Sequence, residues 1–174
     1  MIFWILTSCW YFGSIHVLER AYIKQDIMLL QKHMQHSHQR YMREQSTLFL
    51  SQIPSEKVDE KTKTEIITLL MNCLKNEDEF QDVRAACAVV LGNWNITESV
   101  SSIVQASSQM KQEEDRYWMY YALAKLNTME AKSYLREQGT TDILLQQNLE
   151  EWLEDPNSKL NLVPIFQEFL EDER

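Results

Sequence analysis

Residues 82–100, DVRAACAVVLGNWNITESV, form the stretch that decides the fold. Its first half is an apolar run at helical spacing, with Arg84 near the start and Gly92 at the end. The pattern predicts a helix that stops at Gly92, because glycine adopts a positive φ at little cost. Asn95 or Thr97 is then expected to cap a second helix. The stretch therefore predicts two consecutive helices.

The same arrangement returns 32 residues further along the chain. The residues at matching offsets are Arg84, Leu91, Gly92 and Trp94 in the first copy and Arg116, Leu123, Ala124 and Leu126 in the second. The turn sequence that begins at Asn95 is echoed by the one that begins at Asn127. A period near 32 with two helices per unit is typical of an α-solenoid, in which each helix pair packs on the next.

This stretch resembles HEAT repeats, in particular the short type associated with phycobilisome lyases. The residues that carry the resemblance are Asp82, Val83, Arg84, Ala86, Cys87, Val90, Leu91, Gly92 and the helix start Glu98-Ser99-Val100, with Asp115, Arg116, Met119, Ala122, Leu123 and Leu126 in the second unit. The resemblance covers roughly residues 56–155. It implies a short HEAT-like α-α superhelix, in which Arg84 reaches an acidic neighbour, Asp82 or Asp115.

The composition favours an all-α fold and disfavours nucleic acid as a partner. Gly and Pro together number only six, so few tight turns are encoded. The net charge is −9, and residues 51–174 hold twelve basic side chains against twenty-three acidic ones. Neutralisation of phosphates supplies most of the affinity for nucleic acid, and this acidic body cannot provide it.

Residues 1–18 carry no charged side chain and are predicted to be a membrane anchor. Arg20 and Lys24 follow the apolar segment, so the positive-inside rule places the body of the protein on the cytoplasmic side. Two alternatives stay open. In the first, the segment is a buried first helix of a soluble domain. In the second, the segment contains a lipoprotein-like box in which Cys9 is the lipidated residue.

Residues 19–53 are predicted to form one long stalk-like helix, because no Gly or Pro interrupts residues 19–49. The apolar stripe follows heptad spacing through Ile23, Ile27, Leu30, Met34, Ser37, Tyr41, Glu44 and Leu48. This stripe would either pack against the following helices or form a homodimer through residues 19–49. His33 and His36 share a face, but a solvated polar face is favoured over a metal site.

Residues 54–174 are predicted to form the HEAT-like repeat domain, with Pro54 ending the stalk. A third unit is expected to begin at residue 140 and to close at Pro156. A last short helix with Pro164 in its first turn would cap the open end of the solenoid.

The sequence points to a surface for partners rather than to catalysis. No familiar catalytic motif is present, and all four His residues precede residue 39. No cofactor or metal is predicted. Tyr117 and Tyr121 are expected on the outward face of their helix, and aromatic residues of this kind often anchor interfaces. Trp118 and Trp94 complete the predicted binding set.

These observations lead to two hypotheses for the function, which belong to different classes of protein. The first is a membrane-tethered interaction or scaffold module for a protein or peptide. The alternative, implied by the resemblance, is an accessory or lyase-type protein with a chromophore thioether on Cys73 or Cys87. The three cysteines show no metal-ligand spacing, and small buried thiols in a reducing compartment are favoured over a disulfide.

Overall fold

The computed structural model describes residues 15–139, which are all-helical and contain no strand. This confirms the all-α prediction. Residues 15–23 are helical. The later helices are α2 (Ile27–His36), α3 (Arg40–Ser51), α4 (Glu60–Lys75), α5 (Gln81–Asn93), α6 (Val100–Gln109), α7 (Glu113–Leu126) and α8 (Met129–Gln138), with single 3-10 turns at Ser55–Lys57 and Thr97–Ser99.

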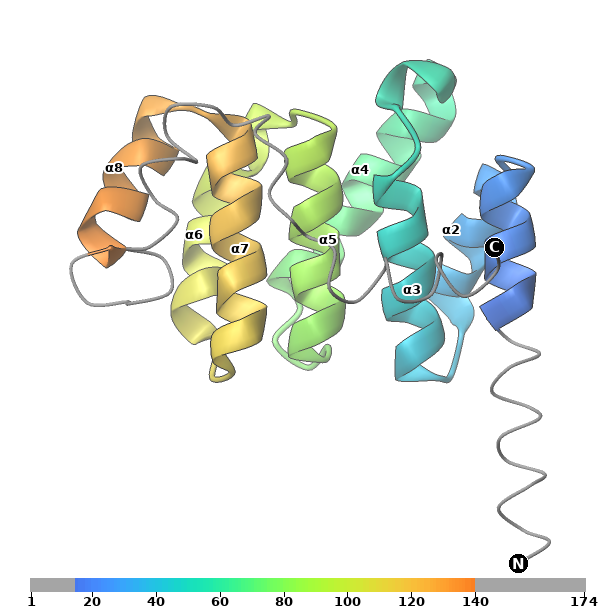
Figure 1. The fold of residues 1–174 in the computed structure, drawn as a ribbon, viewed down its shortest axis with the longest axis horizontal. Coiled ribbons are helices and arrows are strands. Elements are labelled where there is room, and N and C mark those ends of the chain that lie inside the picture. Colours follow the sequence, from blue (N-terminus) through green and yellow to red (C-terminus); the bar gives the residue numbers. More distant parts are fainter. Residues whose placement is uncertain (1–14, 140–174) are drawn as a thin grey trace, which may run out of the picture.

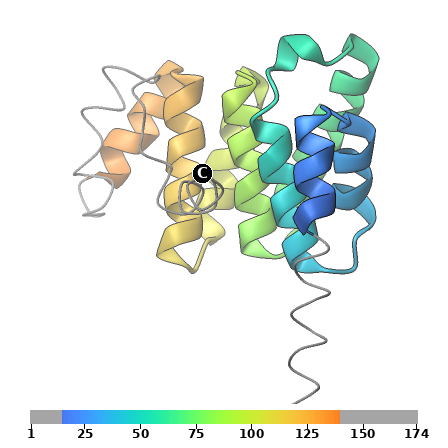
Figure 2. The same cartoon turned by 45° about the vertical axis from the view of Figure 1, so that its right-hand side comes forward.

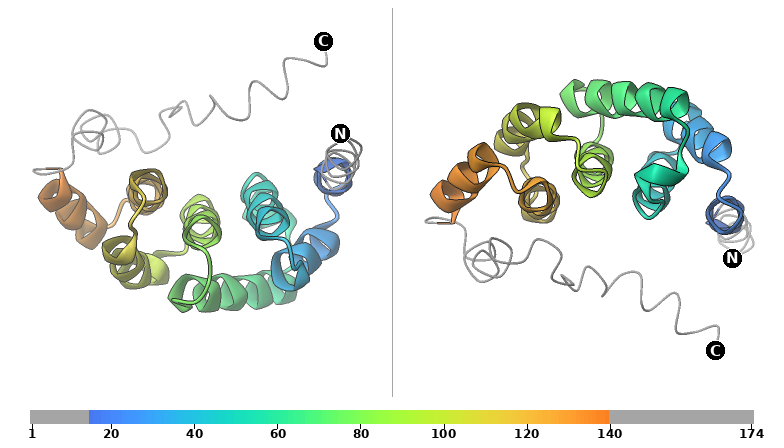
Figure 3. Two further views of the ribbon diagram at one scale, coloured as in Figure 1. Left: turned by 90° about the horizontal axis from the view of Figure 1, so that it is seen from below. Right: turned by 90° about the horizontal axis from the view of Figure 1, so that it is seen from above.

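The helices lie in two layers, and consecutive helices alternate between them (Figures 1 and 2). Helices α3, α5 and α7 stand side by side in one layer, which is called the inner layer below. Helices α2, α4, α6 and α8 form the outer layer. Both layers curve, and the inner layer lies on the inside of the arc (Figure 3).

The structure does not contain the continuous helix predicted over residues 19–53. A first break separates residues 15–23 from α2. Gln25 adopts a left-handed backbone with φ 53°, and the Asp26 carboxylate then caps α2 by accepting a hydrogen bond from the Leu29 amide at 3.0 Å. A side-chain cap of this kind starts a new helix without any Gly or Pro.

A second break separates α2 from α3. Ser37 leaves the helix in an extended conformation, and Arg43 Nη1 donates a hydrogen bond to its carbonyl oxygen at 2.7 Å. The predicted heptad stripe is therefore divided among three helices. Leu30 is fully buried while Ile23 is 76% exposed, so the stripe does not form one continuous seam.

The predicted single-pass membrane anchor is wrong. In the part of the chain that the structure describes, no helix is both long and apolar enough to cross a bilayer. Residues 1–14 of the predicted span lie outside the described residues. Residues 15–18 belong to a helix that also carries Glu19 and Arg20, and Leu18 is fully buried in the protein core.

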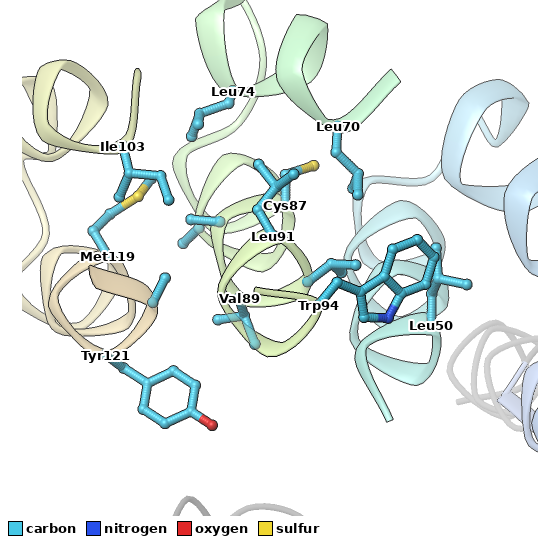
Figure 4. Close-up of a cluster of buried hydrophobic side chains, with 14 of the residues drawn as sticks. Leu50, Leu70, Leu74, Cys87, Val89, Leu91, Trp94, Ile103, Met119 and Tyr121 are labelled. Atoms are coloured by element: carbon cyan, nitrogen blue, oxygen red, sulfur yellow. The ribbon is translucent and has the colours of Figure 1, made fainter. Parts of the chain in front are cut away.

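Helix α5 is the centre of the described core, and every residue from Val83 to Gly92 is buried. Figure 4 shows apolar side chains reaching it from several elements. The labelled members are Leu50 of α3, Leu70 and Leu74 of α4, Ile103 of α6, and Met119 and Tyr121 of α7, with Cys87, Val89, Leu91 and Trp94 from α5 and its end. A helix that is apolar on all sides must be enclosed by its neighbours.

Gly92 has a different role from the one predicted. It lies inside α5, its φ is not positive, and a Cβ atom there would meet Ala122 Cα at 2.8 Å and Ala122 O at 2.9 Å. Glycine is needed because the backbones of α5 and α7 approach closely. The positive φ that the turn requires falls on Asn95 (55°), and Asn127 (52°) repeats it 32 residues later.

The predicted third unit, from residue 140 to Pro156, lies outside the described residues. So does the predicted capping helix that contains Pro164.

Replacement of Gly92 by Ala is expected to lower the free energy of unfolding by about 1–3 kcal/mol, because the new methyl group meets backbone atoms that cannot rotate away. Urea denaturation measures the change. Thr64→Ala on the exposed face of α4 is the control, and it should shift stability by less than about 0.5 kcal/mol. A Gly92→Ala protein as stable as the wild type would contradict the close packing.

Candidate functional site

The first turns of α3 and α5 are joined by two arginines from α3. Arg40 Nε donates to Asp82 Oδ2 at 2.5 Å, and Arg43 Nη2 donates to Glu79 Oε1 at 2.7 Å. Both guanidinium groups also lie over the ring of Phe80, at 5.1 Å and 5.8 Å from its centroid. These ion pairs and cation–π contacts hold the start of α3 against the start of α5 and the residues just before it. We call this end of the two helices the edge of the inner layer.

Three carboxyl groups, one from each inner helix, are near enough for their charges to act on one another: Glu44 of α3, Asp82 of α5 and Asp115 of α7. They are called the acidic cluster below. Asp115 is only 5% exposed, and its Oδ2 atom accepts no hydrogen bond from the described residues. A buried carboxylate oxygen without a donor is unfavourable, since it has lost its water and has gained no hydrogen bond in return.

The environment favours the neutral forms of two members of the cluster. Burial, then the negative charge of Asp82, raises the pKa of Glu44 to about 7, although Arg40 opposes the shift. Burial, with Asp82 and Glu114 next, raises the pKa of Asp115 to about 6. A nearby positive charge lowers both pKa values, as Arg40 already does in part.

The described residues contain no group of three His, Cys, Asp or Glu side chains that could hold a metal ion. His33 also stands apart from any such site, and burial together with the charge of Lys32 lowers its pKa.

Arg84 does not contact either acid that the HEAT resemblance implied. Its side chain is buried, and Nε donates to the Leu74 carbonyl oxygen at 3.0 Å while Nη2 donates to Gln109 Oε1 at 2.7 Å. It therefore joins α5 to the ends of α4 and α6 in the outer layer. Asp82 and Asp115 lie instead at the inner edge described above. Arg116, its counterpart in the second unit, is partly exposed on α7.

Two of the four aromatic residues predicted to bind a partner are buried. Tyr121 is 3% exposed, and its hydroxyl donates to Asn93 Oδ1 at 3.1 Å. Trp94 is 4% exposed, and its Nε1 donates to the Ile53 carbonyl oxygen at 2.9 Å. These side chains tie the inner helices together, so the expectation that Tyr121 faces outward is corrected. Burial raises the pKa of Tyr121 to about 12.

Tyr117 and Trp118 are partly exposed. Trp118 packs edge-on against Tyr117 and Tyr121, with ring centroids 6.3 Å and 6.2 Å apart. Lys125 lies over the ring of Tyr121 at 5.7 Å. Tyr117 and Trp118 come two and three residues after Asp115 on α7, with Arg116 in between, and so lie within about one helical turn of it.

Several residues of the site escaped the sequence analysis. Glu44 had an available signal, because it is the only charged member of an otherwise largely apolar stripe. Asn93 bridges the inner layer by donating to the Ser51 carbonyl oxygen at 3.2 Å and accepting from Tyr121. No local pattern marks it, since both partners are distant in sequence.

Comparisons with protein-family models, with curated proteins and with solved structures found no match for this chain. What the site does is therefore inferred from its own residues and their contacts.

The raised pKa of Glu44 predicts a stability that falls as pH rises. The ordinary value is 4.5 and the folded value is about 7, so the folded state retains a proton that the unfolded state has lost. The destabilisation is absent below about pH 4.5 and complete above about pH 7. Glu44→Gln is expected to raise the free energy of unfolding at pH 8 by about 1–2 kcal/mol, because solvent screens part of the full shift.

Urea denaturation at pH 4.5 and pH 8 measures the effect, and the stabilisation by Glu44→Gln should vanish at the lower pH. Asp59→Asn is the control. Asp59 caps α4, and the hydrogen bond from the Thr62 amide lowers its pKa, so this carboxylate stabilises at high pH and loses that effect as pH falls. If Glu44→Gln is no more stable than the wild type at pH 8, the acidic cluster does not destabilise the fold.

Proposed function

We propose that the chain is a HEAT-like repeat module, a short α-α superhelix that binds a partner protein or peptide on its inner layer. Support for the repeat comes from equivalent residues. Helices α5 and α7 begin at Gln81 and Glu113, which are 32 residues apart, and the left-handed residues Asn95 and Asn127 have the same separation. Helices α5 and α7 also lie side by side in the inner layer (Figure 3).

The observation that carries the binding proposal is the acidic cluster. Glu44, Asp82 and Asp115 come from three successive inner helices, and their charges act on one another. Acids are common in the first turn of a helix, where the helix dipole favours them. That explanation does not account for Asp115 Oδ2, which is buried and without a donor. Arg40 already pairs with Asp82, and a Lys or Arg side chain of a partner would add a further positive charge beside the partly exposed Glu44.

The neighbouring aromatic pair fits the same partner. Tyr117 and Trp118 have partly exposed rings on α7, two and three residues after Asp115. Aromatic rings are frequent anchors of interfaces, and their faces attract ammonium and guanidinium groups. We therefore propose that the inner layer binds a basic segment of a partner. Carboxylates at the edge and the aromatic rings near them would hold this segment. No catalytic role is assigned to these residues.

A peptide array provides the test. Fluorescent peptides of about 12 residues, roughly 40 Å when extended, exceed the width of three packed helices. The array should contain basic sequences and matched sequences in which Lys and Arg are replaced by Gln. The basic peptides are expected to bind with affinity that weakens as salt rises, because the attraction is between partly exposed charges. Fluorescence anisotropy then measures the dissociation constant for the strongest peptides.

The double variant Tyr117→Ala/Trp118→Ala is expected to weaken binding at least about tenfold, which is typical when an aromatic anchor is removed. Met28→Ala is the matched control, since Met28 is a large side chain 67% exposed on α2 of the outer layer. It should leave binding unchanged. Circular dichroism checks that both proteins remain folded. Equal binding by the Gln-substituted peptides, or equal losses in both variants, would contradict the proposal.

A further inference from the structure

Two free thiols face each other across the interface of α4 and α5. The Sγ atoms of Cys73 and Cys87 are 2.8 Å apart. The two residues differ in access to solvent, since Cys87 is fully buried and Cys73 is partly exposed. Figure 4 shows Cys87 directed from α5 toward the side on which the α4 residues Leu70 and Leu74 lie.

We propose that Cys73 and Cys87 are a dithiol pair that closes to a disulfide when a small-molecule disulfide such as oxidised glutathione reacts with Cys73. The inference is independent of the proposed function, because it rests on a different face of α5. A disulfide requires the sulfur atoms to approach to about 2.05 Å. Starting from 2.8 Å, the pair needs a small adjustment of side chains rather than a movement of helices.

The geometry gives the two thiols different roles. Cys87 donates its S–H to Cys73, and Cys73 is the sulfur that a small-molecule disulfide can reach, because it is partly exposed. Burial raises the pKa of Cys87 well above its ordinary value, so this thiol keeps its proton until a partner sulfur is beside it. Cys73 is therefore the attacking residue, and Cys87 is the resolving residue.

The reaction has two exchange steps. The Cys73 thiolate attacks one sulfur of the small-molecule disulfide, which breaks its S–S bond and releases one small thiolate. Cys87 then loses its proton and attacks Cys73 Sγ, which releases the second small molecule as a thiol. Two protein thiols are oxidised to one disulfide, and one small-molecule disulfide is reduced to two thiols.

The test uses the full chain with Cys9→Ser, so that only the two thiols of interest remain. Treatment with oxidised glutathione is expected to lower the intact mass by about 2 Da, the two hydrogens of a closed disulfide. Trypsin cleaves after Lys75 and Arg84, so a linked pair of peptides containing Cys73 and Cys87 identifies the bond. Closure of a short loop should also raise Tm by about 5–10 °C.

Two variants separate the roles of the thiols. In Cys87→Ser, the reaction should stop at a stable glutathione adduct on Cys73, because no resolving thiol is present. In Cys73→Ser, the buried Cys87 should react at least about tenfold more slowly, since thiol exchange depends on access. If either variant fails to fold, the mass and the linked peptides of the parent protein, which carries only Cys9→Ser, still test the proposal. A lasting Cys73 adduct in the parent, without a disulfide, would overturn the proposal.

Discussion

The described structure depends on the burial of α5. Every residue from Val83 to Gly92 is enclosed, so each polar group on this helix needs a partner inside the protein. Arg84 meets that requirement with the Leu74 carbonyl oxygen and Gln109, two groups at helix ends. An unpartnered guanidinium in this position would be prohibitive. One side chain therefore links α5 to both of its outer neighbours, α4 and α6.

The two ends of the inner layer differ in whether their buried polar groups have hydrogen-bond partners. At one end, Asn93 accepts from Tyr121 and donates to Ser51, so three helices share a satisfied polar bridge. At the other end, the acidic cluster leaves Asp115 Oδ2 without a donor. One end thus has its polar groups satisfied, while the other keeps one carboxylate oxygen unsatisfied beside the Arg40–Asp82 ion pair. Carboxyl groups with raised pKa values also occur at binding sites, and the proposed function rests on this likeness.

Much of the fold could be predicted from local pattern. The scarcity of Gly and Pro indicates helices, and the turns at Asn95 and Asn127 follow from a repeated motif. The break before α2 could not be inferred from Gly or Pro, because an Asp26 cap and a left-handed Gln25 make it. The absence of helix breakers permits a long helix but does not require one, since tertiary packing decides where a helix ends.

The site was less predictable because its contacts join distant residues. Periodicity places Tyr121 on the face opposite the core stripe, yet it is buried by neighbours that one helix cannot reveal. The same limit affected Arg84, whose partners Leu74 and Gln109 are not acids at all. A repeat pattern identifies equivalent positions. It does not identify what each position touches, because that depends on which helices are stacked around it.

The thiol pair and the buried arginine act at one junction. Cys73 immediately precedes Leu74, whose carbonyl oxygen Arg84 already holds, and Cys87 lies one helical turn beyond Arg84 on α5. A disulfide there would strengthen a contact whose geometry is set in the reduced protein, so little strain should accompany it. The acidic cluster involves other faces, toward α3 and α7. Oxidation between the layers can therefore stabilise the module without rearranging the inner edge that is proposed to bind.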